Sequence, residues 1–174
     1  MGGAMRMRNF RPGIGLLAVA VCGTPGLAVQ AAAQALVTHR IPAALAMEAV
    51  VAAVEACFKQ GYAETAIVVD TDGVTQALLR GDWTGVHSID SATYKAYTSA
   101  TMKIDTSALV EREKTDPMGP GMAKIPRLLE AGGGVVIKLG DEVVGAIGAS
   151  GAPGSELDEG CAKAGLAKIR DRLK

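Results

Sequence analysis

The sequence predicts an α+β fold in which helices cover a single antiparallel sheet. Two hairpin patterns supply the strands: residues 65–80 turn at Asp72-Gly73, and residues 134–148 turn at Gly140-Asp141. Helical patterns precede, separate and follow the two hairpins. Elements in this order favour helices packed on one layer of paired strands, so a single domain is expected.

The first helix is predicted to run from Pro42 to just before Gly61. Proline suits the first helical position, and glycine readily ends a helix. Between them, small and apolar residues recur at spacings of three and four along one face: Ala46, Val50, Ala53 and Cys57. This face is expected to cover the sheet.

A second helix is predicted to begin at Ser88, whose hydroxyl suits an N-cap. Its inward face carries mostly small residues that permit close packing: Ile89, Ala92, Ala96 and Ala100. A short helix near residues 107–113 and a loop rich in proline and glycine follow. A last helix is predicted over residues 156–173, with one apolar side.

The triple glycine at residues 132–134 is interpreted as a backbone device. It lacks the strand-then-helix context of a phosphate or dinucleotide loop. Glycine instead permits a positive φ just before the strand predicted at residues 135–139, which pairs with residues 142–147.

The N-terminal residues match the three-part pattern of a secretory signal. Three arginines precede an apolar stretch at residues 14–22, and alanine-rich sequence follows. We expect a signal peptide over residues 1–33, cleaved after Ala33, although the alanines two residues to either side fit equally well. The mature domain would then cover residues 34–174 and lie in the periplasm or outside the cell.

Two alternatives to a cleaved signal would attach the N-terminal segment to the membrane, by a lipid anchor or by a transmembrane helix. Cys22 leaves a lipoprotein as one alternative, although Val21 is bulkier than the residue usual before a lipidated cysteine. A transmembrane helix is disfavoured because the apolar run is interrupted well short of the ~20 residues that a span needs. No membrane span is expected after removal of the signal.

The composition excludes several functional classes. The 18 basic and 18 acidic residues balance, and aromatic residues are scarce, which argues against a basic or base-stacking surface for nucleic acid. His39 and His87 are the only histidines, so a site of three imidazoles is excluded within one subunit. No catalytic constellation is recognisable, and the catalytic residues stay unassigned.

Cys57 and Cys161 remain in the mature chain, each within a predicted helix. Export would place them where a disulfide persists. A bridge requires Cα atoms within about 7 Å, which the sequence does not fix. The interpretation preferred here is two small buried apolar residues, with a single disulfide as the alternative.

Four segments in this order resemble the GlcG/HbpS-like haem-degrading family. They are the turn Leu79-Arg80-Gly81-Asp82, the serine-rich stretch 88–103 with Lys95-Ala96-Tyr97-Thr98, the triple glycine, and the loop 145–154 ahead of Asp158-Glu159. The resemblance spans roughly residues 44–172. It implies a profilin-like fold that assembles into homo-oligomers, with a tetrapyrrole site beside the 88–103 helix.

His87 is the candidate ligand for haem iron, because it lies in a loop where an imidazole can be exposed. Arg80 and Lys95 are candidate partners of the haem propionates or of a small anionic ligand. The competing interpretations are ordinary surface roles, such as a pairing of Arg80 with Asp82. A Cys-His attachment motif is lacking, so haem would be held without a covalent link.

The family resemblance adds three candidates on the helix that borders the tetrapyrrole site. Thr101 and Met102 are alternative axial ligands, and Thr98 lies beside them. Methionine is a known haem ligand, whereas a threonine oxygen is a weak one. Structural use in the core or on the surface is the competing interpretation for each.

The leading functional hypothesis is an exported haem-binding protein that promotes haem degradation through iron and oxygen chemistry. The alternatives are a non-enzymatic oligomeric sensor or accessory module, and a protein that binds small carboxylates. Convergence of His87, Thr101 and Met102 on one pocket would favour haem, and their dispersal would favour assembly.

Overall fold

The computed structural model describes residues 37–174 of the 174-residue chain. The predicted signal peptide and its cleavage site lie outside the described residues. In chain order the elements are α1 Ala43–Phe58, β1 Thr65–Asp70, β2 Thr75–Arg80, α2 His87–Met102, α3 Thr106–Glu113, α4 Gly119–Met122, β3 Gly134–Leu139, β4 Glu142–Ser150, α5 Ser155–Ile169 and a final 3₁₀ turn, Arg170–Arg172.

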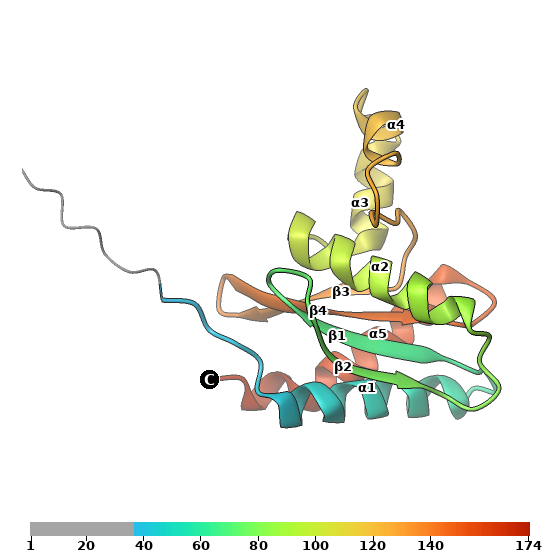
Figure 1. Cartoon of the computed structure of the whole chain (residues 1–174), viewed down its shortest axis with the longest axis vertical. Coiled ribbons are helices and arrows are strands. Elements are labelled where there is room, and N and C mark those ends of the chain that lie inside the picture. The colour runs from blue at the N-terminus through green and yellow to red at the C-terminus, as the bar shows by residue number, and fades with distance from the viewer. Residues whose placement is uncertain (1–36) are drawn as a thin grey trace, which may run out of the picture. The chain divides into compact units, whose positions relative to one another are not determined.

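The strands form one antiparallel sheet in the order β2-β1-β4-β3. Both predicted hairpins are present, and β1 pairs with β4 to join them into one sheet. Helices α1 and α5 cover one face, and α2 lies across the other (Figure 1). The predicted α+β fold with an antiparallel sheet covered by helices is therefore confirmed.

The face under α1 and α5 carries the larger core. Alternate strand residues such as Val68 and Ile147 point into it and meet the small inward residues of α1. A Cβ atom at Gly165 of α5 would lie 2.5 Å from the carbonyl oxygen of Ala49. This glycine therefore allows α1 and α5 to pack backbone against backbone.

Helix α2 also approaches the sheet closely, because both surfaces are built from small residues. Ala92, Ala96 and Ala100 are buried against the strands, as predicted. A Cβ atom at Gly148 would overlap the carbonyl oxygen of Ala92, and one at Gly134 would overlap that of Lys95. Gly134 in the edge strand β3 and Gly148 in the central strand β4 thus set the depth at which α2 lies on the sheet.

The preferred interpretation of the cysteines is wrong. Cys57 in α1 and Cys161 in α5 form a disulfide, and their Cα atoms lie 5.6 Å apart. The physical reason is the close packing of α1 on α5, which brings the two residues together although 104 positions separate them in the chain. Both cysteines are buried.

Several element boundaries differ from the predicted ones. Helix α2 begins at His87, and Ser88 makes no cap hydrogen bond, because its Oγ lies instead 2.6 Å from the carbonyl oxygen of Gly85 and 2.7 Å from Thr65 Oγ1. The segment predicted as a loop contains the one-turn helix α4. Gly133 has a φ of +120°, so the predicted conformational role of the triple glycine is confirmed at this position.

None of the helices in residues 37–174 combines the length and the apolar character that crossing a membrane requires.

Candidate functional site

The sequence-predicted site residues lie along α2 and the loop before it, and they do not converge. His87 is the first residue of α2, and Met102 is the last. With a rise of about 1.5 Å per residue, the two lie roughly 22 Å apart along the helix. One iron atom therefore cannot be bound by both within one chain, and the candidates fall into three separate environments. This dispersal is the outcome expected of an assembly module, so a haem site can use only one of these environments.

The first environment is the loop at residues 81–86, between β2 and α2. His87 is exposed there, close to an apolar surface that is open to solvent. Trp83 is 93% exposed and Val86 is 73% exposed, and Leu78 within β2 is 36% exposed. Two large apolar side chains within four residues of an exposed imidazole leave apolar area open to a ligand.

The loop is held in a defined shape although it is exposed. The backbone carbonyl of Glu64 accepts hydrogen bonds from the Gly81 amide at 2.8 Å and from Thr84 Oγ1 at 3.1 Å. Arg80 donates from Nε and Nη2 to the Thr84 carbonyl, at 2.9 and 2.6 Å. Trp83 has a φ of +66°, an unfavourable conformation for a bulky residue that these bonds help to maintain.

The second environment is the buried middle of α2. Lys95 is 3% exposed, and its Nζ lies 2.6 Å from Asp158 Oδ2 and 3.3 Å from the carbonyl oxygen of Ala149. Thr98 is also buried, and its Oγ1 accepts a hydrogen bond from the Leu129 amide at 2.8 Å. Lys95 therefore has an internal partner and shares no surface with Arg80.

The third environment is the C-terminal end of α2. Thr101 is exposed, and its Oγ1 donates to the Tyr97 carbonyl at 2.8 Å, while Met102 is half-buried. The guanidinium of Arg127 lies over the Tyr97 ring, with Cζ 4.1 Å from the ring centre. Thr101 and Met102 are neighbours at the end of α2, so the two alternative axial ligands lie near each other and far from His87.

A buried acidic group was missed by the sequence interpretation. Glu64 is 1% exposed, and its Oε2 accepts a hydrogen bond from the Ala152 amide at 3.0 Å. Asp158 Oδ1 accepts from the same amide, also at 3.0 Å. Burial, and after it the negative charge of Asp158, raises the pKa of Glu64 to about 8. Nothing around Glu64 in the sequence distinguishes it, because the fold alone brings Asp158 to it from α5.

A cavity of about 530 Å³ lies between α3, the segment before β3 and the start of α5. No sequence-predicted site residue lines it. Its walls carry four glutamates and two serines: Glu111, Glu130, Glu156, Glu159, Ser107 and Ser155. Carboxylates in this number disfavour a dianionic ligand. Residues 37–174 hold no group of three or more histidine, cysteine or acidic side chains arranged for a metal ion.

The sequence model of the family of haem-degrading HbpS-like proteins matches residues 41–167 of the chain. The chain belongs to this HbpS-like family. The resemblance derived from its motifs is thereby confirmed. None of the curated proteins compared with the HbpS-like chain matches it.

Solved structures agree with the membership in the HbpS-like family. HbpS from Streptomyces reticuli, solved as a double mutant, is 37% identical with a TM-score of 0.72, and the match covers 76% of this chain and 89% of that one. ORFY from Klebsiella pneumoniae is 24% identical with a TM-score of 0.73, covering 79% and 95%. PduOC, solved as a heme complex, is 22% identical with a TM-score of 0.67, covering 75% and 96%. The last two show likeness of fold alone.

The buried carboxyl of Glu64 makes the stability of this HbpS-like protein depend on pH. Its pKa in the folded state, about 8, exceeds the ordinary value of 4.5, so the folded protein binds the extra proton between these values. The free energy of unfolding should therefore fall as pH rises from about 4.5 to 8 and level off above. Urea unfolding at several pH values, with the disulfide intact, measures this decline.

Glu64→Gln should flatten the decline, because the amide does not titrate. Glu55→Gln is the matched control, since Glu55 lies in an exposed pair with Lys59 on α1. An unchanged decline in Glu64→Gln would show that another group titrates.

Proposed function

We propose that this chain is an exported protein that binds haem without a covalent link. The proposed surface consists of the end of β2, the loop 81–86 and the start of α2. The observation that carries the proposal is an exposed imidazole, His87, beside the exposed apolar side chains Trp83 and Val86. Membership in the haem-degrading HbpS-like family supports the choice of ligand.

The side chains present fit the three chemical parts of haem. An imidazole is a common ligand of haem iron. The apolar faces of the macrocycle match Trp83, Val86 and Leu78, which otherwise lie open to water. The guanidinium of Arg80 suits a propionate, because its bonds to the Thr84 carbonyl use Nε and Nη2 and not Nη1. His87 packs against Gly85, where a Cβ atom would lie 2.6 Å from its Cε1.

The C-terminal end of α2 is the alternative site for the iron ligand. Thr101 and Met102 would then replace His87, with Thr98 buried beneath them. Met102 is half-buried, and the Thr101 hydroxyl already donates to a backbone carbonyl, so both are less available than the imidazole. Lys95 would reach a propionate only by leaving Asp158. The His87 surface is therefore preferred.

Bound haem would supply iron and oxygen chemistry, which is the basis of a degrading activity. The chain's own contribution is to hold the macrocycle and to leave part of it open, because the proposed surface is exposed. PduOC, a protein of the same fold, was solved as a heme complex, which supports binding.

A haem titration followed by absorbance tests the proposed site. His87→Ala should lose the saturable Soret band, or weaken binding at least about tenfold, because the iron loses its axial ligand. His39→Ala is the matched control, since it removes the other histidine, whose Nδ1 lies 2.6 Å from Glu142 Oε2.

The outcomes of the titration separate the candidate sites and ligands. A band that persists in His87→Ala and is lost in Met102→Ala would move the site to the C-terminal end of α2. Absence of a band in the unaltered chain would overturn haem binding and favour a small carboxylate held by Arg80, which titration calorimetry with citrate measures. Decay of the Soret band under added peroxide tests degradation separately from binding.

A homo-oligomer is the second part of the proposal, and it rests on the outer face of α1. Met47, Val51 and Phe58 are 50%, 37% and 66% exposed there, at spacings that place them on one side of the helix. Apolar stripes of this kind are buried in assemblies. Phe58→Glu should lower the mass measured by light scattering, whereas Val74→Glu on the far hairpin should not. Equal masses would remove this face as the interface.

Export is proposed from the N-terminal signal pattern, and the disulfide between α1 and α5 supports it, because such bridges persist in oxidising compartments. We expect the mature protein in the periplasmic or secreted fraction, beginning at Gln34. Mass spectrometry of the fractionated protein measures this. An uncleaved chain in the cytoplasm would contradict export.

A further inference from the structure

The disulfide and the buried carboxyl of Glu64 are in direct contact. Glu64 Oε2 lies 3.2 Å from Cys57 Sγ, and both residues are buried. A sulfur in a disulfide has no proton to donate, so a proton in this contact must reside on Glu64. The arrangement places an acid against one of the two atoms that separate when the disulfide is reduced.

The charges that face Glu64 favour the protonated acid. Asp158 from α5 and Lys95 from α2 are the charged groups that meet it, and Lys95 already pairs with Asp158. A second buried carboxylate would lack a cation, and Glu64 Oε1 has no hydrogen-bond partner among the described residues. The pKa of Glu64, raised to about 8, agrees with a neutral acid at pH 7.

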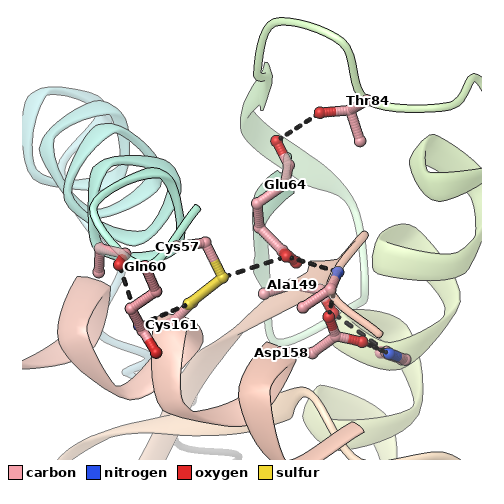
Figure 2. Close-up of a disulfide and its surroundings, with 10 residues drawn as sticks. Cys57, Gln60, Glu64, Thr84, Ala149, Asp158 and Cys161 are labelled. Atoms are coloured by element: carbon pink, nitrogen blue, oxygen red, sulfur yellow. Dashed lines mark hydrogen bonds and ion pairs between the residues drawn. A yellow bond between two sulfur atoms is a disulfide. The ribbon is translucent and has the colours of Figure 1, made fainter. Parts of the chain in front are cut away.

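The other sulfur, Cys161 Sγ, is also fully buried, and the exposed residue Gln60 lies against it. Gln60 is exposed, its Nε2 donates to the Ala56 carbonyl at 2.9 Å, and the same nitrogen lies 3.8 Å from Cys161 Sγ. Figure 2 shows Gln60 and Glu64 on opposite sides of the disulfide. An attack on Cys161 therefore needs local opening at Gln60, while Cys57 stays against the acid.

Glu64 also anchors the loop at residues 81–86. Its backbone carbonyl holds the Gly81 amide and the Thr84 hydroxyl, and Figure 2 shows the bond to Thr84 on the side away from the disulfide. A Cβ atom at Gly81 would lie 2.6 Å from the same carbonyl oxygen, so loop and strand are in close contact. The side chain that contacts the disulfide and the carbonyl that holds the loop therefore belong to the same residue, Glu64.

We propose that Cys57 and Cys161 form a redox-active disulfide, that Glu64 is its proton donor, and that the loop 81–86 responds to its redox state. A thiolate of an external dithiol attacks Cys161 Sγ, the bond between the protein sulfurs breaks, and Cys57 leaves as a thiolate that takes the proton of Glu64. The second thiol of the reductant then closes its own disulfide and releases Cys161, which gains a proton from solvent. The protein gains two electrons and two protons, counting the return of a proton to Glu64 from water, and the dithiol is oxidised.

Reduction removes the covalent tie between α1 and α5 beside the residue that holds the loop. The loop should become less ordered in the reduced protein, because Glu64 lies six residues after the α1 end at Phe58 and loses the fixed sulfur that it contacts. Reduction should therefore also weaken ligand binding at His87, and this expectation alone rests on the proposed function.

The proton-donor role is tested by the rate at which dithiothreitol reduces the full mature chain between pH 6 and 9. Glu64→Gln should react about a hundredfold more slowly than the unaltered chain at pH 7, the lower end of the range for loss of an acid catalyst. The ratio of the two rates cancels the ionisation of dithiothreitol itself. It should shrink above pH 8, where Glu64 has lost its proton.

Glu55→Gln is the control, because it makes the same change two residues from Cys57 in an exposed pair. It should react at the rate of the unaltered chain. A rate ratio for Glu64→Gln that stays constant from pH 6 to 9 would show a purely structural effect and overturn the donor role. Resistance of the unaltered, folded chain to reduction would overturn the redox-active disulfide.

Hydrogen exchange measures the coupling to the loop without haem. Amides of residues 81–86 should exchange at least about tenfold faster in the reduced chain, as local order is lost. Residues 134–139 of β3, which do not contact the disulfide, serve as the internal reference. The Cys57→Ser, Cys161→Ser chain should match the reduced chain. Equal exchange in the loop of both redox states would overturn the coupling, whatever the result of the haem titration.

Discussion

The buried ion pair between Lys95 and Asp158 is the interaction on which the rest of the structure depends. It joins α2, on one face of the sheet, to α5, on the other, and Lys95 also reaches the carbonyl of Ala149 in β4. Burying two charges is repaid only when both find partners, and removing one partner of such a pair typically costs about 3–5 kcal/mol. The pair uses Lys95, the cation that acts on Glu64 within residues 37–174, and this leaves the neighbouring carboxyl of Glu64 without a cation of its own.

The close approach of the helices explains how this pair is possible. Because Gly134 and Gly148 let α2 lie against the strand backbone, the Lys95 side chain is long enough to reach the start of α5. Small residues likewise let α1 pack closely on α5 at Gly165, and this close packing sets Cys57 beside Cys161. With small residues filling the interfaces, an ion pair links the two faces of the sheet and a disulfide links the two helices on one face.

The sequence predicted the fold well, because hairpin turns and apolar periodicity are local signals. The positions of Asp72-Gly73 and of the alanines of α2 followed from them. The links between distant segments did not, since no local pattern reports that Cys57 meets Cys161 or that Glu64 meets Asp158. For the candidate site, residue chemistry made His87 a candidate, which stays a prediction. Its separation from Met102 follows from the boundaries of α2, where the N-cap is Val86, two residues before the predicted cap at Ser88.

The carboxyl at position 64 needs an explanation beyond the fold. The hydrogen bonds that hold Gly81 and Thr84 use its backbone carbonyl, which any residue provides. Its side chain is buried beside the carboxylate of Asp158, which penalises its ionisation, and its Oε1 has no partner among the described residues, which costs stability. A glutamine would keep the bond to Ala152 through its amide oxygen and would avoid the charge. Stability alone therefore favours a neutral side chain here, and an ionisable group in contact with Cys57 is better explained by the proton that it can give to sulfur.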